Sequence, residues 1–187
     1  MPLQQIITTW FALNGSNDDS PSGVADLRTG AAVFAGGLNA GDYFDLTEQE
    51  ANEHSYDQIG ILHAGRYRRV QLSPQATVAN QGVGKLGFMP TLLVPELNIV
   101  TTQDLGVAAG RIVVFLNVVD PGKYCFVQEL GIATVNLSGA VAAAGPVSVG
   151  AAGIAAPGST SPIGYALGAV TAAGPGLVLL NLPVVQG

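Results

Sequence analysis

Residues 130–187, the last 58 of the chain, contain no Asp, Glu, Lys, Arg or His. Every charged side chain therefore lies in the first 129 positions. Proton transfer, metal binding and the recognition of charged ligands all need ionisable groups, and this segment has none. We expect the charge-free segment to pack, either within its own fold or against a partner, as in a structural or assembly protein.

Turn-forming residues divide the charge-free segment. Gly145-Pro146, Pro157-Gly158 and Gly174-Pro175-Gly176 interrupt it, and its longest apolar run, 177–185, is too short to cross about 30 Å of hydrocarbon. The N-terminus lacks the positive and long apolar regions of a secretory signal. We therefore expect neither a membrane-spanning helix nor an export signal.

The length of the chain fits one domain, or one domain with a smaller appendage. A chain of 187 residues can bury a hydrophobic core without disulfides. The single cysteine, Cys125, excludes an internal disulfide framework and a cysteine-based zinc site. It lies in an apolar run, so we interpret it as a small buried hydrophobic residue.

Charge is distributed unevenly along the rest of the chain. Residues 1–57 hold nine acidic side chains and one basic one, whereas residues 58–129 hold six basic and four acidic ones. The net charge of −6 argues against nucleic-acid binding, which needs a concentrated basic face. The asymmetry suits complementary contacts between subunits, and a solvated acidic surface explains it equally.

We divide the chain into three parts. Residues 1–23 form an N-terminal arm and tether, an apolar β-prone stretch followed by a polar run, which either docks on a neighbouring subunit by strand addition or is an ordinary first strand and loop. Residues 24–57 form an acidic and largely irregular segment. Its short helix, at 48–54, is predicted by the capping box of Thr47 and Glu50. Residues 58–187 form the β-rich domain.

The β-rich domain consists of short apolar runs separated by Gly, Pro and Asn. Asp120-Pro121-Gly122 favours a type II turn that pairs the strands before and after it as a hairpin. The last run is apolar on both faces, so we expect a central strand or one that a partner covers. This strand density predicts a mainly β fold, a small barrel or sandwich. The expected strands are 59–62, 67–72, 76–78, 86–89, 98–102, 111–119, 123–129, 163–167 and 177–182.

The sequence lacks the common catalytic and nucleotide-binding motifs. His54, Asp57 and His63 have no recognised metal-ligand spacing, and we assign no metal ion or other cofactor to the chain. Glu50 and Glu53, together with His54 and Asp57, offer acid and base groups but no nucleophile or pocket. A solvated acidic face explains them better, so we assign no catalytic or binding residue and expect no enzyme.

One basic cluster stands out, Arg66, Arg68 and Arg69 around Tyr67. A nucleic-acid contact is one interpretation, but the strand period would place these arginines on two faces. We favour a surface that pairs with carboxylates, either those of residues 42–57 or those of a partner, because arginine makes bidentate contacts with them.

The charge-free segment contains three stretches in a distinctive order: residues 144–150, AGPVSVG, then 160–174, TSPIGYALGAVTAAG, and 177–182, LVLLNL. With these stretches it resembles the C-terminal half of the capsid decoration (cement) proteins of tailed bacteriophages. Residues 66–72 and 121–131 resemble a strand and hairpin of the same proteins, and residues 1–57 match nothing comparable. The resemblance implies a β-tulip-like barrel without catalytic residues.

The resemblance also implies a location and partners. A protein of this kind is made in the host cytoplasm and binds the outer surface of an icosahedral capsid. There it stabilises contacts between major capsid protein subunits, and it often forms a homotrimer.

Two other functions fit parts of the sequence. A tail fibre or other receptor-binding virion component would also be rich in Gly and strands, but it should show repeats or a cluster of aromatic residues. A small hydrolase domain would use the carboxylates near Glu50. Substituting Glu50 and Asp57 by Ala would then abolish its activity.

Overall fold

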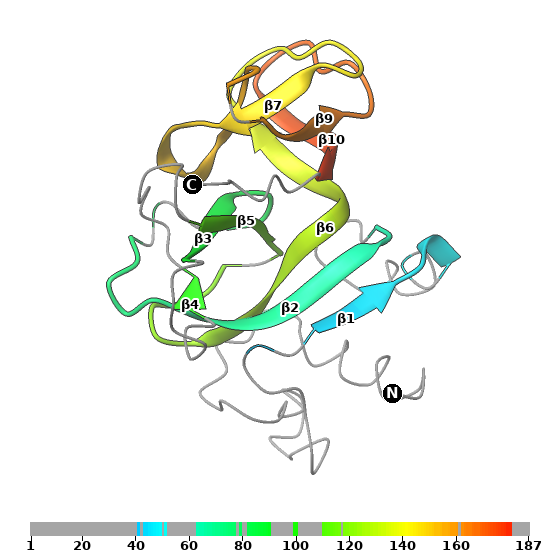
Figure 1. Cartoon of the computed structure of the whole chain (residues 1–187). Coiled ribbons are helices and arrows are strands. Elements are labelled where there is room, and N and C mark those ends of the chain that lie inside the picture. The colour runs from blue at the N-terminus through cyan, green and yellow to red at the C-terminus, as the bar shows by residue number, and fades with distance from the viewer. Residues whose placement is uncertain are drawn as a thin grey trace.

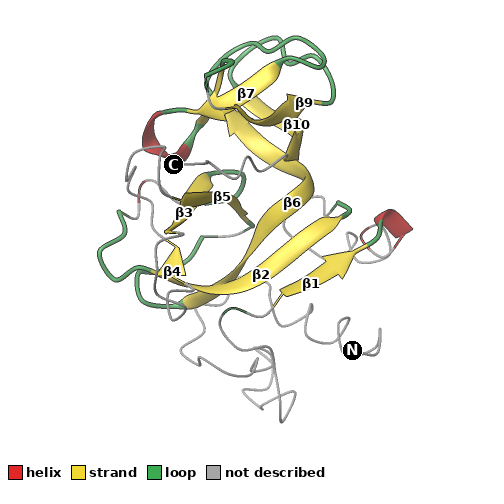
Figure 2. Cartoon of the chain, viewed as in Figure 1, coloured by secondary structure: helices red, strands yellow, loops and turns green. Residues whose placement is uncertain are grey.

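The computed structural model describes residues 41, 43–49, 51, 63–77, 79, 82–90, 99–100, 110–116, 118–160 and 162–180. Strands and loops dominate this part of the chain (Figure 2). The expectation of a mainly β fold with a small barrel is confirmed. The strands are β1 (Tyr43–Leu46), β2 (Gly65–Leu72), β3 (Leu86–Pro90), β4 (Ile99–Val100), β5 (Gly110–Phe115), β6 (Tyr124–Leu137), β7 (Pro146–Val149), β8 (Ala155–Pro157), β9 (Pro162–Ala166) and β10 (Gly174–Leu180).

Strand β6 runs through the whole described structure (Figure 1). Its first half pairs with β2 and β5 in what we call the N-terminal sheet, which β1, β3 and β4 complete. Its second half pairs with β10, and the order continues through β9 and β7 to β8. Because β8 returns to β6 at Leu137 and Ala155, these five strands close into what we call the barrel.

The barrel is narrow, and this explains its small residues. A five-stranded barrel leaves little room inside for side chains. Ala133, Ala155 and Ala166 are fully buried in its core. A Cβ added at Gly176 would collide with the Leu137 side chain. The described part of the Gly- and Ala-rich, charge-free segment, residues 130–160 and 162–180, is therefore folded, as the apolar run at 177–182 predicts.

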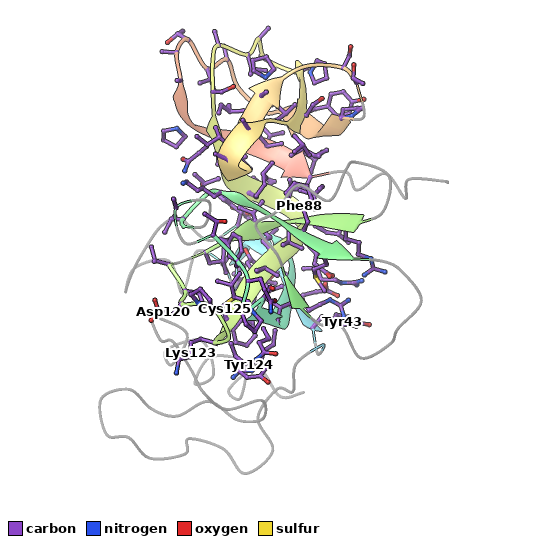
Figure 3. All side chains as sticks on the ribbon, turned by 90° about the vertical axis from the view of Figure 1, so that its left-hand side faces the viewer. Tyr43, Phe88, Asp120, Lys123, Tyr124 and Cys125 are labelled. Carbon is purple, nitrogen blue, oxygen red and sulfur yellow. The ribbon has the colours of Figure 1, made fainter. Side chains whose placement is uncertain are left out.

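The antiparallel strands β3 and β5 lie between two hydrophobic cores. Phe88, Ile112 and Val114 pack into the barrel core, whereas Val113 and Phe115 pack into the core of the N-terminal sheet. Figure 3 shows Phe88 between the barrel at the top and the sheet end that carries Cys125. Both faces of β5 are buried over residues 112–115, which explains why these four residues are all apolar.

At the passage from sheet to barrel, β6 and β2 come very close. Gly65 lies opposite Gly131, and an added Cβ at either position would overlap backbone atoms of the other strand. Gly131 also has a φ of +93°, which favours glycine. Next to this pair, Arg66 faces Leu130 and Tyr67 faces Gln128, so Glu129 is the extra residue of a β-bulge.

Several expected elements are confirmed and others corrected. The 120–123 turn has the hydrogen bond from Lys123 N to Asp120 O and a positive φ at Gly122, and the strands beside it pair antiparallel. Residues 76–77 form no strand, because Ala76 N bonds to Ser73 O in a turn instead. Residues 48, 49 and 51 are helical. The expected arm at 1–23, the expected strand at 59–62 and residues 52–54 of the expected helix lie outside the described residues.

Strand β1 belongs to the acidic segment at residues 24–57, which we expected to be largely irregular. Its four residues pair antiparallel with β2, from Tyr43 opposite Arg68 to Leu46 opposite Gly65. Part of residues 24–57 is therefore built into the N-terminal sheet. The division at residue 57 stays a prediction.

Candidate interaction surface

Strand β10 turns alternate residues into and out of the barrel. Gly176, Val178 and Leu180 are buried in the barrel, whereas Leu177 and Leu179 point outward and remain exposed. This is the period of two that a strand imposes on its side chains. β10 pairs with β6 on one side and β9 on the other, so the expectation of a central strand is confirmed.

The neighbouring strands extend this outward face into two cross-strand rows. Leu179 lies opposite Ile132 of β6 and Tyr165 of β9. Leu177 lies opposite Thr134, and its carbonyl oxygen accepts a hydrogen bond from the backbone N–H of Leu167. We call the six residues the barrel face: Ile132, Thr134, Tyr165, Leu167, Leu177 and Leu179.

The barrel face is apolar and exposed. Tyr165, Leu167, Leu177 and Leu179 each keep between 40% and 47% of their surface accessible. All four lie in the segment without charged residues, so the phenol of Tyr165 is the one ionisable group among the six residues. Exposed apolar residues that stand alone are ordinary, but a contiguous group marks a contact site. The barrel face is thus a candidate protein-contact surface.

The basic cluster lies on the N-terminal sheet, and Arg66 pairs with a carboxylate of residues 42–57, as the sequence predicts. Arg66 donates to both carboxylate oxygens of Asp45, from Nε at 2.8 Å and from Nη2 at 3.0 Å. This hydrogen bond and the charge of Arg66 lower the pKa of Asp45. The guanidinium of Arg66 also lies 4.4 Å from the centre of the Tyr43 ring, which Figure 3 shows at the sheet end of the molecule.

Arg68 has a different and buried partner, Glu129. Its Nε and Nη2 donate to the two oxygens of Glu129 at 2.5 and 3.2 Å, and its Nη1 donates to Gly41 O. The bulge at Glu129 turns this carboxylate toward Arg68. Arg111 adds an ion pair at 3.7 Å. Because Glu129 is almost fully buried, its paired arginines are needed to offset the loss of hydration.

Arg69 faces the other side of the strand. It is buried, and its guanidinium lies 5.6 Å from the Tyr124 ring centre and 5.5 Å from that of Phe126. Such contacts stabilise a desolvated cation. The predicted split of the three arginines over two faces is thus confirmed.

Of the candidate acid, base and metal residues, the structure describes His63 alone. Glu50, Glu53, His54 and Asp57 lie outside the described residues. His63 is buried, and burial lowers its pKa. Among the residues with described placement, no three His, Cys, Asp or Glu side chains could share a metal ion.

Cys125 is buried in the N-terminal sheet, as expected. Burial raises the pKa of its thiol to about 12. Within the described part of the chain, no helix is long and apolar enough to cross a membrane.

Comparison with known proteins gives a weak structural similarity. No protein-family model matches the chain, and no curated protein matches it. The N base of the head fiber gp8.5 in bacteriophage phi29, a crystal structure, is similar over 62% of this chain and 92% of its own, with a TM-score of 0.37 and 13% identity. With a TM-score this low, the similarity between the two structures decides neither the fold nor the function of this chain.

The barrel face was not among the sites that sequence reasoning singled out. The signal was present in residues 177–180, which are apolar on both faces of a strand. One face fills the barrel and the other is exposed, a distinction that needs the position of β10 relative to its neighbours.

Proposed function

We propose that this protein is a structural component of a tailed-bacteriophage virion that binds the outer capsid surface. It stabilises contacts between major capsid protein subunits there, as a cement or decoration protein. One observation supports the proposal above others, the exposed apolar barrel face within a folded segment that has no charges. Burying such a surface against protein costs little, because few polar groups lose their hydration.

The resemblance of residues 144–182 to decoration proteins supports the same function. We also propose that the protein associates with itself as a homo-oligomer, which we expect to be a trimer. Neither nucleic acid nor a membrane is a partner in this proposal. The protein is proposed to have no catalytic activity. Substitution of Glu50 and Asp57 by Ala should therefore abolish no activity, in contrast to the expectation for a hydrolase.

Binding to capsids tests the proposal directly. Expanded capsids that lack the protein are mixed with the purified chain and sedimented, with unexpanded shells as the comparison. We expect saturable co-sedimentation with expanded capsids. A chain that stays in the supernatant at concentrations of tens of micromolar would contradict the proposal, because contacts of standard size bury about 1,600 Å² and bind more tightly.

Copy number separates a decoration protein from a tail-fibre or receptor-binding component. Quantitative mass spectrometry of purified virions gives the number of chains per particle. A protein that covers the shell is expected in hundreds of copies, as one per lattice position requires. A handful of copies per particle would assign the protein to the tail.

A further inference from the structure

We propose that Glu48 and His63 form an acid-sensitive switch at the start of β2. When His63 takes up a proton, the carboxylate of Glu48 leaves the backbone N–H of Ala64 and pairs with the imidazolium instead. The switch lies where the segment after β1 meets β2. It uses no side chain of the barrel face, so the inference stands independently of the proposed function.

The buried imidazole of His63 carries the first step. No described residue forms a hydrogen bond with its Nε2, although the residue is buried. A neutral imidazole can keep one nitrogen as an unprotonated acceptor, whereas an imidazolium has two N–H donors that both need a partner. A buried charged donor without a partner is more costly than a neutral one. Proton uptake at His63 therefore requires a new acceptor close to the ring.

Glu48 can supply that acceptor. Burial lowers the pKa of His63 and the charge of Glu48 opposes this shift, so the carboxylate lies near enough to act on the ring. Its Oε2 now accepts a hydrogen bond from the N–H of Ala64, the next residue in the chain, at 3.1 Å. Because the carboxylate does not bond Nε2 in this position, it must move to reach an imidazolium. A charge-assisted hydrogen bond between two ions is stronger than one to a neutral amide, so protonation favours the move.

The backbone of His63 is held in place, whereas Glu48 is exposed. The hydroxyl of Tyr67 donates to His63 O at 2.6 Å and accepts from His63 N at 3.4 Å. Burial raises the pKa of Tyr67, so this phenol stays neutral. Ala64 O accepts from the N–H of Ile132 on β6 at 3.0 Å. The exposed side chain of Glu48 is therefore the part that moves.

The other charged groups at this end of β2 already have partners. Arg66 pairs with Asp45 of β1, and Arg68 pairs with Glu129 of β6. Residues 130–132 of β6 are Leu, Gly and Ile, which do not titrate. Within the described part of the chain, the segment after β1 thus carries the anion that is available to the imidazolium.

Nuclear magnetic resonance of the full chain between pH 7 and 5 tests the inference. The ring resonances of His63 report its protonation, and the amide proton of Ala64 reports its hydrogen bond to Glu48. We expect both to change with the same midpoint. The Ala64 amide should lose the downfield shift that a hydrogen bond to a carboxylate gives. The amide of Leu179 in β10 should not follow this midpoint, because the switch is local.

Three variants separate the switch from other titrations. Glu48→Gln can still accept from Ala64 N but carries no charge, so the midpoint of His63 should move to lower pH and the Ala64 amide should no longer follow it. His63→Phe should leave the Ala64 amide unchanged over this range, and it identifies the ring signals of His63. Asp45→Asn, the matched control, removes an exposed carboxylate from β1 and should leave the switch intact.

Three results would overturn it. The first is an Ala64 amide whose shift stays the same while His63 titrates. The second is a midpoint of His63 that Glu48→Gln leaves unaltered. The third is a chain that unfolds on acidification while its His63 ring is still neutral. Where His63→Phe does not fold, the two midpoints of the wild type and the Glu48→Gln variant still decide. Capsid binding is measured separately, so failure of either proposal is recognised on its own.

Discussion

His63 is buried, and no hydrogen-bond partner for its Nε2 lies among the described residues. Burial lowers its pKa in the folded state, and the nearby charge of Glu48 opposes the shift. The unfolded chain therefore binds a proton first as the pH falls below about 6.5. Stability is fully present above that pH and decreases toward the lower folded pKa, by at most about 1.4 kcal/mol per pH unit.

Replacement by a residue that does not titrate should remove this dependence. We expect His63→Phe to show a flatter dependence of the free energy of unfolding on pH than the wild type between pH 7 and 5. Urea denaturation at several pH values measures it. Equal slopes in both proteins would show that other groups titrate instead.

The two carboxylates that pair with arginine should differ in their contribution to stability. Glu129→Gln removes the buried carboxylate and leaves the partly buried Arg68 without its counter-charge, so we expect a loss of about 3–5 kcal/mol. Asp45→Asn removes an exposed pair of similar geometry and should cost at most about 1 kcal/mol. Urea unfolding of both variants gives the comparison, and equal losses would refute the distinction.

At the scale of residues, the sequence indicated pairing but not every partner. Asp45 lies within the range expected for a carboxylate partner of the arginines, and Cys125 is buried as expected. Glu129 could not be identified, because a strand without the bulge would turn its side chain differently. Register and bulges depend on the partner strand, which the local sequence does not contain.

The bend of β6 depends on glycine. Gly131 has a positive φ, and an added Cβ there would overlap the carbonyl oxygen of Ala64. Gly131→Ala should therefore lower the free energy of unfolding by at least about 3 kcal/mol. Gly122 has a positive φ but open space around it, and Gly122→Ala should cost about 1–2 kcal/mol.

Gly168 provides the control for this series. Its Cβ would meet nothing within 4 Å and its φ is not in the left-handed region, so Gly168→Ala should change stability by less than about 0.5 kcal/mol. Thermal and urea unfolding give the three values. The reverse order, with Gly122 more sensitive than Gly131, would show that close approach of β2 and β6 is unimportant.

At the scale of elements, long or strongly marked strands were predictable and short ones were not. β3, β9 and β10 follow apolar runs bounded by turn residues, and β2 follows a β-prone run that includes three arginines. β7 and β8 have only four and three residues, rich in Ala, Pro and Val, and barrel closure rather than local preference makes them strands. β1 is equally short and depends on its pairing with β2.

The whole molecule should unfold in one step. β3 and β5 contribute to both cores, so neither core is complete without them. We expect Phe88→Ala, which removes a side chain from the barrel core, to cost about 3–5 kcal/mol. Hydrogen exchange should show that amides of β2 in the sheet and β10 in the barrel lose protection equally. Loss confined to β10 would show two independent units.

The continuity of β6 has a mechanical consequence. A force applied to the barrel end reaches the N-terminal sheet along one covalent strand, with no loop between them. The hydrogen bonds to β2 and β10 then lie across the direction of pull, so they must shear together instead of opening one at a time. If the N-terminal sheet were anchored and the barrel pulled, the protein would unfold only when both hydrophobic cores rupture.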